Sequence, residues 1–121
     1  MKEKHEIILK GSVDMDNMSN KAKVIYAAFQ EMGAVNKESK VTSYAILDYI
    51  VEEAETLQEN ELLKDIPDQE YVDITLDVNI KSINAIVTSL AKKDLVVKTE
   101  PSTITVDGTS RSLRQYFLKQ K

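Results

Sequence analysis

An amphipathic helix followed directly by strands is the strongest constraint that this sequence places on its fold. On a helical wheel, the apolar side chains between residues 80 and 91 fall inside an arc of roughly 140°. They are Ile80, Ile83, Ile86, Val87, Leu90 and Ala91. Asn79 can cap the start, and Lys92 and Lys93 lie in the last turn, where cations complement the helix dipole. The pattern predicts a helix over residues 79–93 with one face in a core.

The opposite face of this helix carries no acidic residue. Its members are Lys81, Ser82, Asn84, Ala85, Thr88, Ser89, Lys92 and Lys93. Short side chains let a helix approach another surface closely, and lysines at both ends can meet phosphates. Asparagine can pair with adenine, and alanine or threonine can touch the thymine methyl group. We expect this face to contact nucleic acid; the alternative is a merely solvated surface.

Residues 95–118 are predicted to form strands joined by a tight turn. Asp107-Gly108 is a strong hairpin signal between two extended segments. Arg111 and Arg114 lie near or just past this turn. A hairpin with a basic tip is therefore expected directly after the helix.

Two further helices are predicted earlier in the chain. The first covers residues 19–32, with Ser19 or Asn20 as its N-cap and Gly33 just past its end. A short strand is expected before it, at residues 6–11.

The second of these helices is predicted over residues 41–57, where Thr42 or Ser43 can cap its start. Its apolar residues keep helical spacing. They are Ile46, Tyr49, Ile50, Ala54 and Leu57. Both helices therefore contribute an apolar stripe to the core.

Residues 48–77 form an acidic stretch, with 11 Asp and Glu residues against one base, Lys64. Residues 58–78 are interpreted as an acidic insertion before the helix at 79–93. Strict alternation of apolar and polar residues favours a strand over residues 71–78. A short helix beginning at Pro67 stays open as the alternative.

Few residues offer catalytic or metal-binding chemistry. The 121 residues include no cysteine and one histidine, His5, and no phosphate-binding loop or nucleophile motif occurs. On the expected strand, Asp73, Thr75 and Asp77 would share one side, which we interpret as a solvated face, with a magnesium site as the alternative. We expect a protein without enzymatic activity, bound metal or cofactor.

The net charge of −4 hides an uneven distribution of charge. Residues 1–79 hold 8 lysines and 17 acidic residues, whereas residues 80–121 hold 8 basic and 3 acidic residues. Such asymmetry indicates one surface for a polyanion and another for a different partner. No apolar run approaches the length of a membrane span or a secretion signal, so we expect a cytoplasmic protein.

Residues 82–98, SINAIVTSLAKKDLVVK, resemble the recognition helix and the start of the wing in the MarR-like winged-helix family. The resemblance extends over roughly residues 19–119. It assigns Ile83, Val87 and Leu90 to the core and the polar face of the helix to the DNA major groove. In that assignment the groove-facing residues are Lys81, Ser82, Asn84, Ala85, Thr88 and Ser89.

The same resemblance assigns Arg111 and Arg114 to a basic wing. In addition, the helix starting at Val41 resembles the helix that precedes the recognition helix in that family. Asp94 stands where the family has glycine, and aspartate tolerates a left-handed helix cap better than most residues. The residues after the wing contain no counterpart of the family's C-terminal dimerisation helix. A homodimer would therefore use other surfaces.

The expected fold is α+β: a winged helix with a three-helix core and a C-terminal β-hairpin wing. Residues 1–18 would form an N-terminal arm and residues 19–121 one domain. The expected function is sequence-specific binding of double-stranded DNA by a small transcriptional regulator, with Lys92, Lys93 and the two arginines adding affinity for any sequence. The alternative is an adaptor, or an inhibitor of a nucleic-acid enzyme, that binds a protein through residues 48–77.

Overall fold

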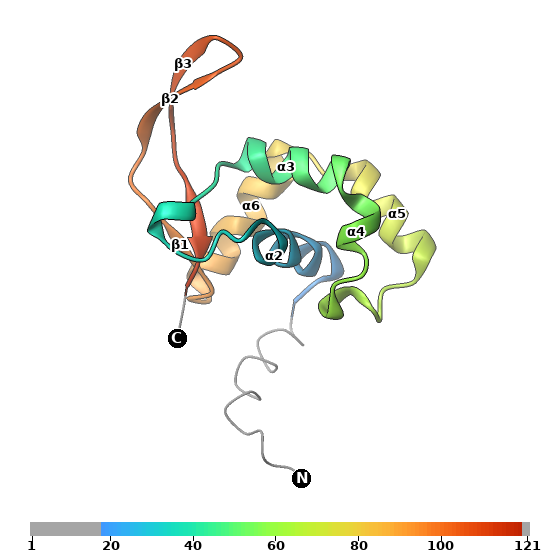
Figure 1. Cartoon of the computed structure of the whole chain (residues 1–121). Coiled ribbons are helices and arrows are strands. Elements are labelled where there is room, and N and C mark those ends of the chain that lie inside the picture. The colour runs from blue at the N-terminus through green and yellow to red at the C-terminus, as the bar shows by residue number, and fades with distance from the viewer. Residues whose placement is uncertain (1–17, 120–121) are drawn as a thin grey trace.

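The computed structural model describes residues 18–119, which form a mixed α+β structure with helices first and short strands last (Figure 1). The helices are α2 (Asn20–Met32), α3 (Ser43–Glu52), α4 (Ala54–Leu57), α5 (Asp68–Asp77) and α6 (Ile80–Lys92), with 3-10 turns η1 (Lys37–Ser39) and η2 (Glu61–Leu63). The strands are β1 (Val96–Lys98), β2 (Ser102–Val106), β3 (Thr109–Leu113) and β4 (Tyr116–Leu118). The strand expected at residues 6–11 and His5 lie outside the described residues.

Helix α2 confirms the first predicted helix, including both of its ends. Ser19 is the N-cap, and its side chain accepts a hydrogen bond from the backbone N–H of Ala22. Gly33 ends the helix in the left-handed conformation, with φ of 72°, which glycine adopts without a steric penalty. The helix is central to the core, because Ile25, Phe29 and most of its other apolar residues are buried.

The second predicted helix exists but is broken. Thr42 caps α3 as expected, by accepting from the N–H of Ala45. At Glu53 the backbone leaves the helical region, with φ −117° and ψ 30°, and α4 begins one residue later. The break occurs where neither glycine nor proline marks it in the sequence.

The strand predicted over residues 71–78 is wrong, because these residues belong to α5 and its C-cap. Tyr71, Ile74 and Val78 are buried at helical spacing, whereas Val72 and Leu76 are exposed. Helix α5 begins directly after Pro67, as the alternative interpretation had it, and Asp68 lies in its first turn, where the helix dipole favours a carboxylate.

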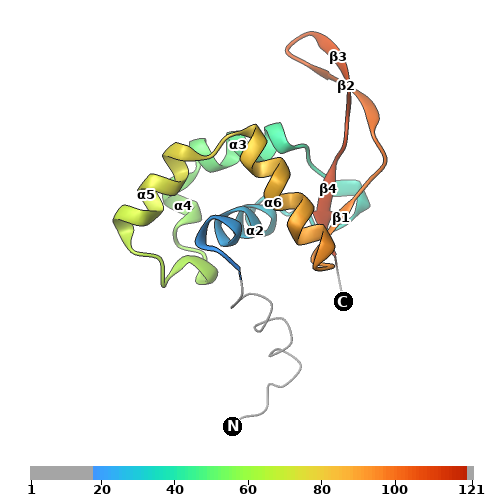
Figure 2. The same ribbon diagram turned by 180° about the vertical axis from the view of Figure 1, so that it is seen from behind.

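Helix α6 confirms the helix predicted over residues 79–93. Ile83, Val87 and Leu90 are almost fully buried, and α6 packs against α2, α3 and β1. Ile80 and Ile86, also expected inside, are half-buried. In Figure 2, α6 crosses in front of α2 and its outer side faces away from the other helices. Within residues 18–119, no helix has the length and apolar character needed to cross a membrane.

The strands form two separate antiparallel pairs. Strand β1 pairs with β4, and β2 pairs with β3 to form a hairpin that projects beyond the helices (Figure 1). Asp107 and Gly108 make its turn with φ of 54° and 78°, as two-residue hairpins require, which confirms the predicted turn. Val41 adds a bridge to Tyr116 through two backbone hydrogen bonds of 2.8 Å, so the chain before α3 is tied to the sheet.

Tyr71 makes the stability of the fold sensitive to alkaline pH. Its hydroxyl donates a 2.6 Å hydrogen bond to the carbonyl oxygen of Ala54, and burial, with a smaller effect of Tyr49, raises its pKa from 10.0 to about 12. The folded protein therefore keeps this proton between pH 10 and 12 while the unfolded chain loses it. The free energy of unfolding falls as pH rises through this window, by up to about 1.4 kcal/mol per pH unit.

We expect Tyr71→Phe to lower stability by about 1 kcal/mol at neutral pH, because a hydrogen bond is lost, and to make the alkaline decline shallower. Urea unfolding of both proteins from neutral pH to about pH 11.5 measures this. Tyr26, whose pKa burial also raises, is present in both proteins and serves as an internal reference. Identical declines would contradict the assignment to Tyr71.

Candidate nucleic-acid interface

Reciprocal hydrogen bonds fix the start of α6. The Oδ1 atom of Asn79 accepts from the N–H of Ser82 at 2.9 Å, and Ser82 Oγ accepts from the N–H of Asn79 at 3.0 Å. This capping box satisfies backbone groups that a helix start leaves without partners. Only Val78 and Asn79 separate α5 from α6, so the cap also fixes where α6 leaves α5. The hydroxyl of Ser82, predicted to contact DNA, is thus part of the cap.

A straight ridge of side chains lies on the outer side of α6. Lys81, Ala85, Thr88 and Lys92 follow one another at spacings of four, three and four residues, which places them along one side of the helix. Thr88 is half-buried, and the other three are exposed. At 1.5 Å per residue, the two lysines are about 16 Å apart along the helix axis. We call these four residues the α6 ridge.

The α6 ridge keeps its positive charge. Among the described residues, ion pairs engage Lys21, Lys64 and Lys119 and none of the lysines of α6. The helix contains no acidic residue, and Lys93, at its C-cap, is exposed and adds a further cation. An anion that approaches the ridge therefore meets lysines without a competing carboxylate on the same helix.

Two other predicted contacts lie on the flanks of the ridge. Asn84 is exposed, and its Oδ1 atom accepts a hydrogen bond from Oγ of Ser43, the buried first residue of α3. A bidentate pair with adenine uses both the oxygen and the nitrogen of the amide, so this bond restricts the predicted role of Asn84. Ser89, on the other flank, is exposed.

Arg111 lies on β3 and contacts α3 through Tyr44. Its Nη1 atom donates a 2.8 Å hydrogen bond to the Tyr44 hydroxyl, and its guanidinium carbon lies 5.9 Å from the centre of the ring. Both contacts bring the hairpin towards the N-terminal end of α3. Tyr44 was not among the residues predicted to belong to the site. Its position could have indicated a contact, because it is a large aromatic residue that lies beside the apolar stripe of its helix rather than within it.

Arg114 lies just after β3, at the base of the hairpin. It lines a hollow of about 150 Å³ together with Thr42, Asn84 and Leu113. The structure therefore brings Asn84 and Arg114, two predicted site residues, to the same hollow. The expected basic tip is wrong, because the turn is Asp107-Gly108 and both arginines follow it on the returning chain.

Asp94 follows the last turn of α6 in the left-handed conformation, with φ of 66°. This confirms the expectation from the sequence that aspartate can occupy the left-handed cap position here. Both carboxylate oxygens of Asp94 accept hydrogen bonds of 2.8 Å from Nζ of Lys119. The negative charge next to Lys92 and Lys93 therefore has a positive partner.

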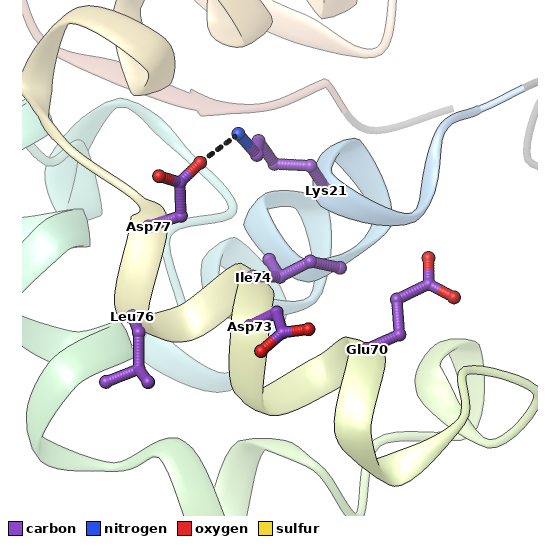
Figure 3. A pocket seen from close by; sticks show the side chains of 6 residues that line it. All are labelled: Lys21, Glu70, Asp73, Ile74, Leu76 and Asp77. Atoms are coloured by element: carbon purple, nitrogen blue, oxygen red, sulfur yellow. Dashed lines mark hydrogen bonds and ion pairs between the residues drawn. The ribbon is translucent and has the colours of Figure 1, made fainter.

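The acidic residues once placed on a strand lie instead on α5. Asp77 forms a 3.2 Å ion pair with Lys21 of α2, as Figure 3 shows, and Asp73 accepts a hydrogen bond from Gln69. Thr75 donates to the backbone of Val72. The described part of the chain contains no group of three or more acidic or histidine residues placed to hold a metal ion.

Comparisons with protein-family models, curated proteins and solved structures found no match.

Two substitutions of Asp94 separate backbone strain from charge. We expect Asp94→Gly to stabilise the fold by about 0.5 to 1 kcal/mol, because glycine relieves the left-handed strain, and loss of an exposed ion pair costs little. Asp94→Ala removes the same charge but keeps a Cβ atom at positive φ, so it is expected to destabilise the fold. Urea unfolding compares the two, and equal effects would contradict the role of backbone strain.

Proposed function

We propose that this chain is a winged helix-turn-helix protein that binds double-stranded DNA and acts as a small regulator of transcription. Helix α6 enters the major groove, and the β2–β3 hairpin serves as a wing against the flanking backbone. The observation that carries the proposal is the α6 ridge, an acid-free line of short side chains with a lysine near each end that forms no ion pair among the described residues.

The order of elements supports this reading. Helices α5 and α6 are joined by two residues, which suits a helix-turn-helix pair with α6 as the recognition helix. In this proposal α5 is the helix that precedes the recognition helix, whereas the sequence had suggested the helix that starts near Val41. The bridge from Val41 to Tyr116 and the β1–β4 pair hold the base of the hairpin beside α6, where a wing belongs.

The dimensions of the α6 ridge suit a major groove. The groove is about 12 Å wide, and the ridge lysines, about 16 Å apart, can reach phosphates on both of its walls. Between them, Ala85 and Thr88 are short enough to let the helix approach the base edges. Their methyl groups suit contact with thymine.

The hairpin supplies the second set of cations in this proposal. Arg111 is held against Tyr44, which keeps the wing beside the N-terminal end of α3. Arg114 lines the hollow next to Asn84 and is exposed, so it is available to a phosphate or a minor groove beside the α6 contact.

Replacing both ridge lysines tests the proposed function. We expect Lys81→Ala with Lys92→Ala to weaken binding to every duplex by about tenfold or more, because two phosphate contacts are lost. The slope of log affinity against log salt should become shallower by roughly 1.8. Gel shift or fluorescence anisotropy at several salt concentrations measures both quantities.

The matched control is Lys37→Ala with Lys64→Ala, which changes the net charge equally at exposed positions outside α6. This control should keep nearly all of the affinity. Equal losses in both variants would show that binding follows net charge alone, and no binding by the unmodified protein at about 0.1 M salt would reject the proposal.

A further inference from the structure

A second surface of the molecule exposes apolar side chains. In the described part of the chain, the large hydrophobic residues that remain exposed are Val51 of α3 and Val72 and Leu76 of α5. Leu76 is 80% exposed and Val51 62%. Isolated exposed apolar residues are common on proteins, so their arrangement decides whether they matter.

Helices α3 and α5 contact each other, and Figure 1 shows that they run in opposite directions. The N-terminal end of α5 meets the α3–α4 break, where Tyr71 bonds to Ala54. The C-terminal end of α5 leads into α6, whose Asn84 contacts Ser43 at the start of α3. The two ends of α5 therefore lie near the two ends of α3.

Each of the two helices carries one pair of apolar residues. Leu47 and Val51 are one turn apart on α3, and Val72 and Leu76 are one turn apart on α5. Leu47 is half-buried and the other three are exposed. Figure 3 shows Leu76 directed away from the Lys21–Asp77 ion pair. We call these four residues the α3–α5 seam.

Acidic residues flank the α3–α5 seam on both helices, and Lys21, which lines a hollow with Leu76, is paired with Asp77. Asp48 and Glu52 on α3 and Asp68 and Asp73 on α5 are exposed near it. Lys64, the single base between residues 48 and 77, pairs with Glu61 at 3.0 Å. The hydrogen bonds that Asp68 and Asp73 accept come from neutral glutamine side chains, so they leave the charge of both carboxylates in place.

We propose that the α3–α5 seam binds a basic amphipathic helix of a partner protein. Its apolar side would cover Val51, Val72 and Leu76, and its lysines and arginines would face the acidic rim. A second copy of this chain does not fit, because the same carboxylates would oppose one another. DNA is repelled for the same reason. The proposal uses residues outside the α6 ridge and does not depend on DNA binding.

A synthetic peptide of about 18 residues tests it, with leucine at i, i+3, i+4 and i+7 and lysine elsewhere. A scrambled peptide of equal composition controls for charge alone. We expect the ordered peptide to bind more tightly and Leu76→Gln to weaken it by about tenfold, since an apolar anchor is lost. Anisotropy measures the affinity, and amide NMR shifts locate the peptide on α3 and α5.

Charge is tested by a matched pair of variants. Asp48→Asn with Asp73→Asn should weaken peptide binding, whereas Glu38→Gln with Glu100→Gln, an equal change of charge at distant exposed positions, should not. Lys81→Ala with Lys92→Ala should leave peptide binding intact, which separates this proposal from DNA binding.

Three results of the peptide experiments would overturn the proposal. They are equal binding of the scrambled peptide, unchanged affinity in Leu76→Gln, and NMR shifts centred on α6 or the hairpin. A dimer in sedimentation that Leu76→Gln dissociates would also overturn it, because the seam would then bind a second copy.

Discussion

The burial of one side of α6 is the constraint on which the rest of the structure depends. Ile83, Val87 and Leu90 insert where α2, α3 and β1 meet, so the same three side chains join the helical part to the strands. Removing them from water also fixes the rotation of the helix. The α6 ridge therefore points outward because the opposite side is fully committed to the core.

Local signals predicted much of the fold, and contacts distant in sequence decided the rest. The caps of α2, α3 and α6 and the Asp107-Gly108 turn act through neighbouring residues, so their residue types predict them. The apolar residues of segment 71–78 fit both the period of a strand and the period of a helix. Burial of Tyr71 and its hydrogen bond to Ala54 favour the helix. At the site, the α6 face was predictable, but the contacts of Ser43 and Tyr44 join residues 41 and 67 positions apart, which no local pattern reveals.

The acidic residues that flank α6 are neutralised by ion pairs, so they weaken the positive charge of its lysines less than unpaired carboxylates would. Asp77 lies just before the helix and Asp94 just after it, and each is paired with a lysine from another element, Lys21 and Lys119. Exposed ion pairs of this kind add little to stability. Their consequence is electrostatic, because they reduce the negative field at both ends of the α6 ridge, while α6 itself contains no acidic residue.

This arrangement also limits how the proposed DNA complex would read sequence. The Ser82 hydroxyl belongs to the helix cap, and the Asn84 oxygen is bonded to Ser43, so base contacts fall to Ala85, Thr88 and Ser89. Methyl and hydroxyl groups distinguish bases less sharply than a bidentate amide or guanidinium. Affinity in such a complex would come mainly from phosphate contacts of the lysines and arginines. Selectivity would then depend on the fit of a narrow helix surface to the shape of the groove as much as on hydrogen bonds to bases.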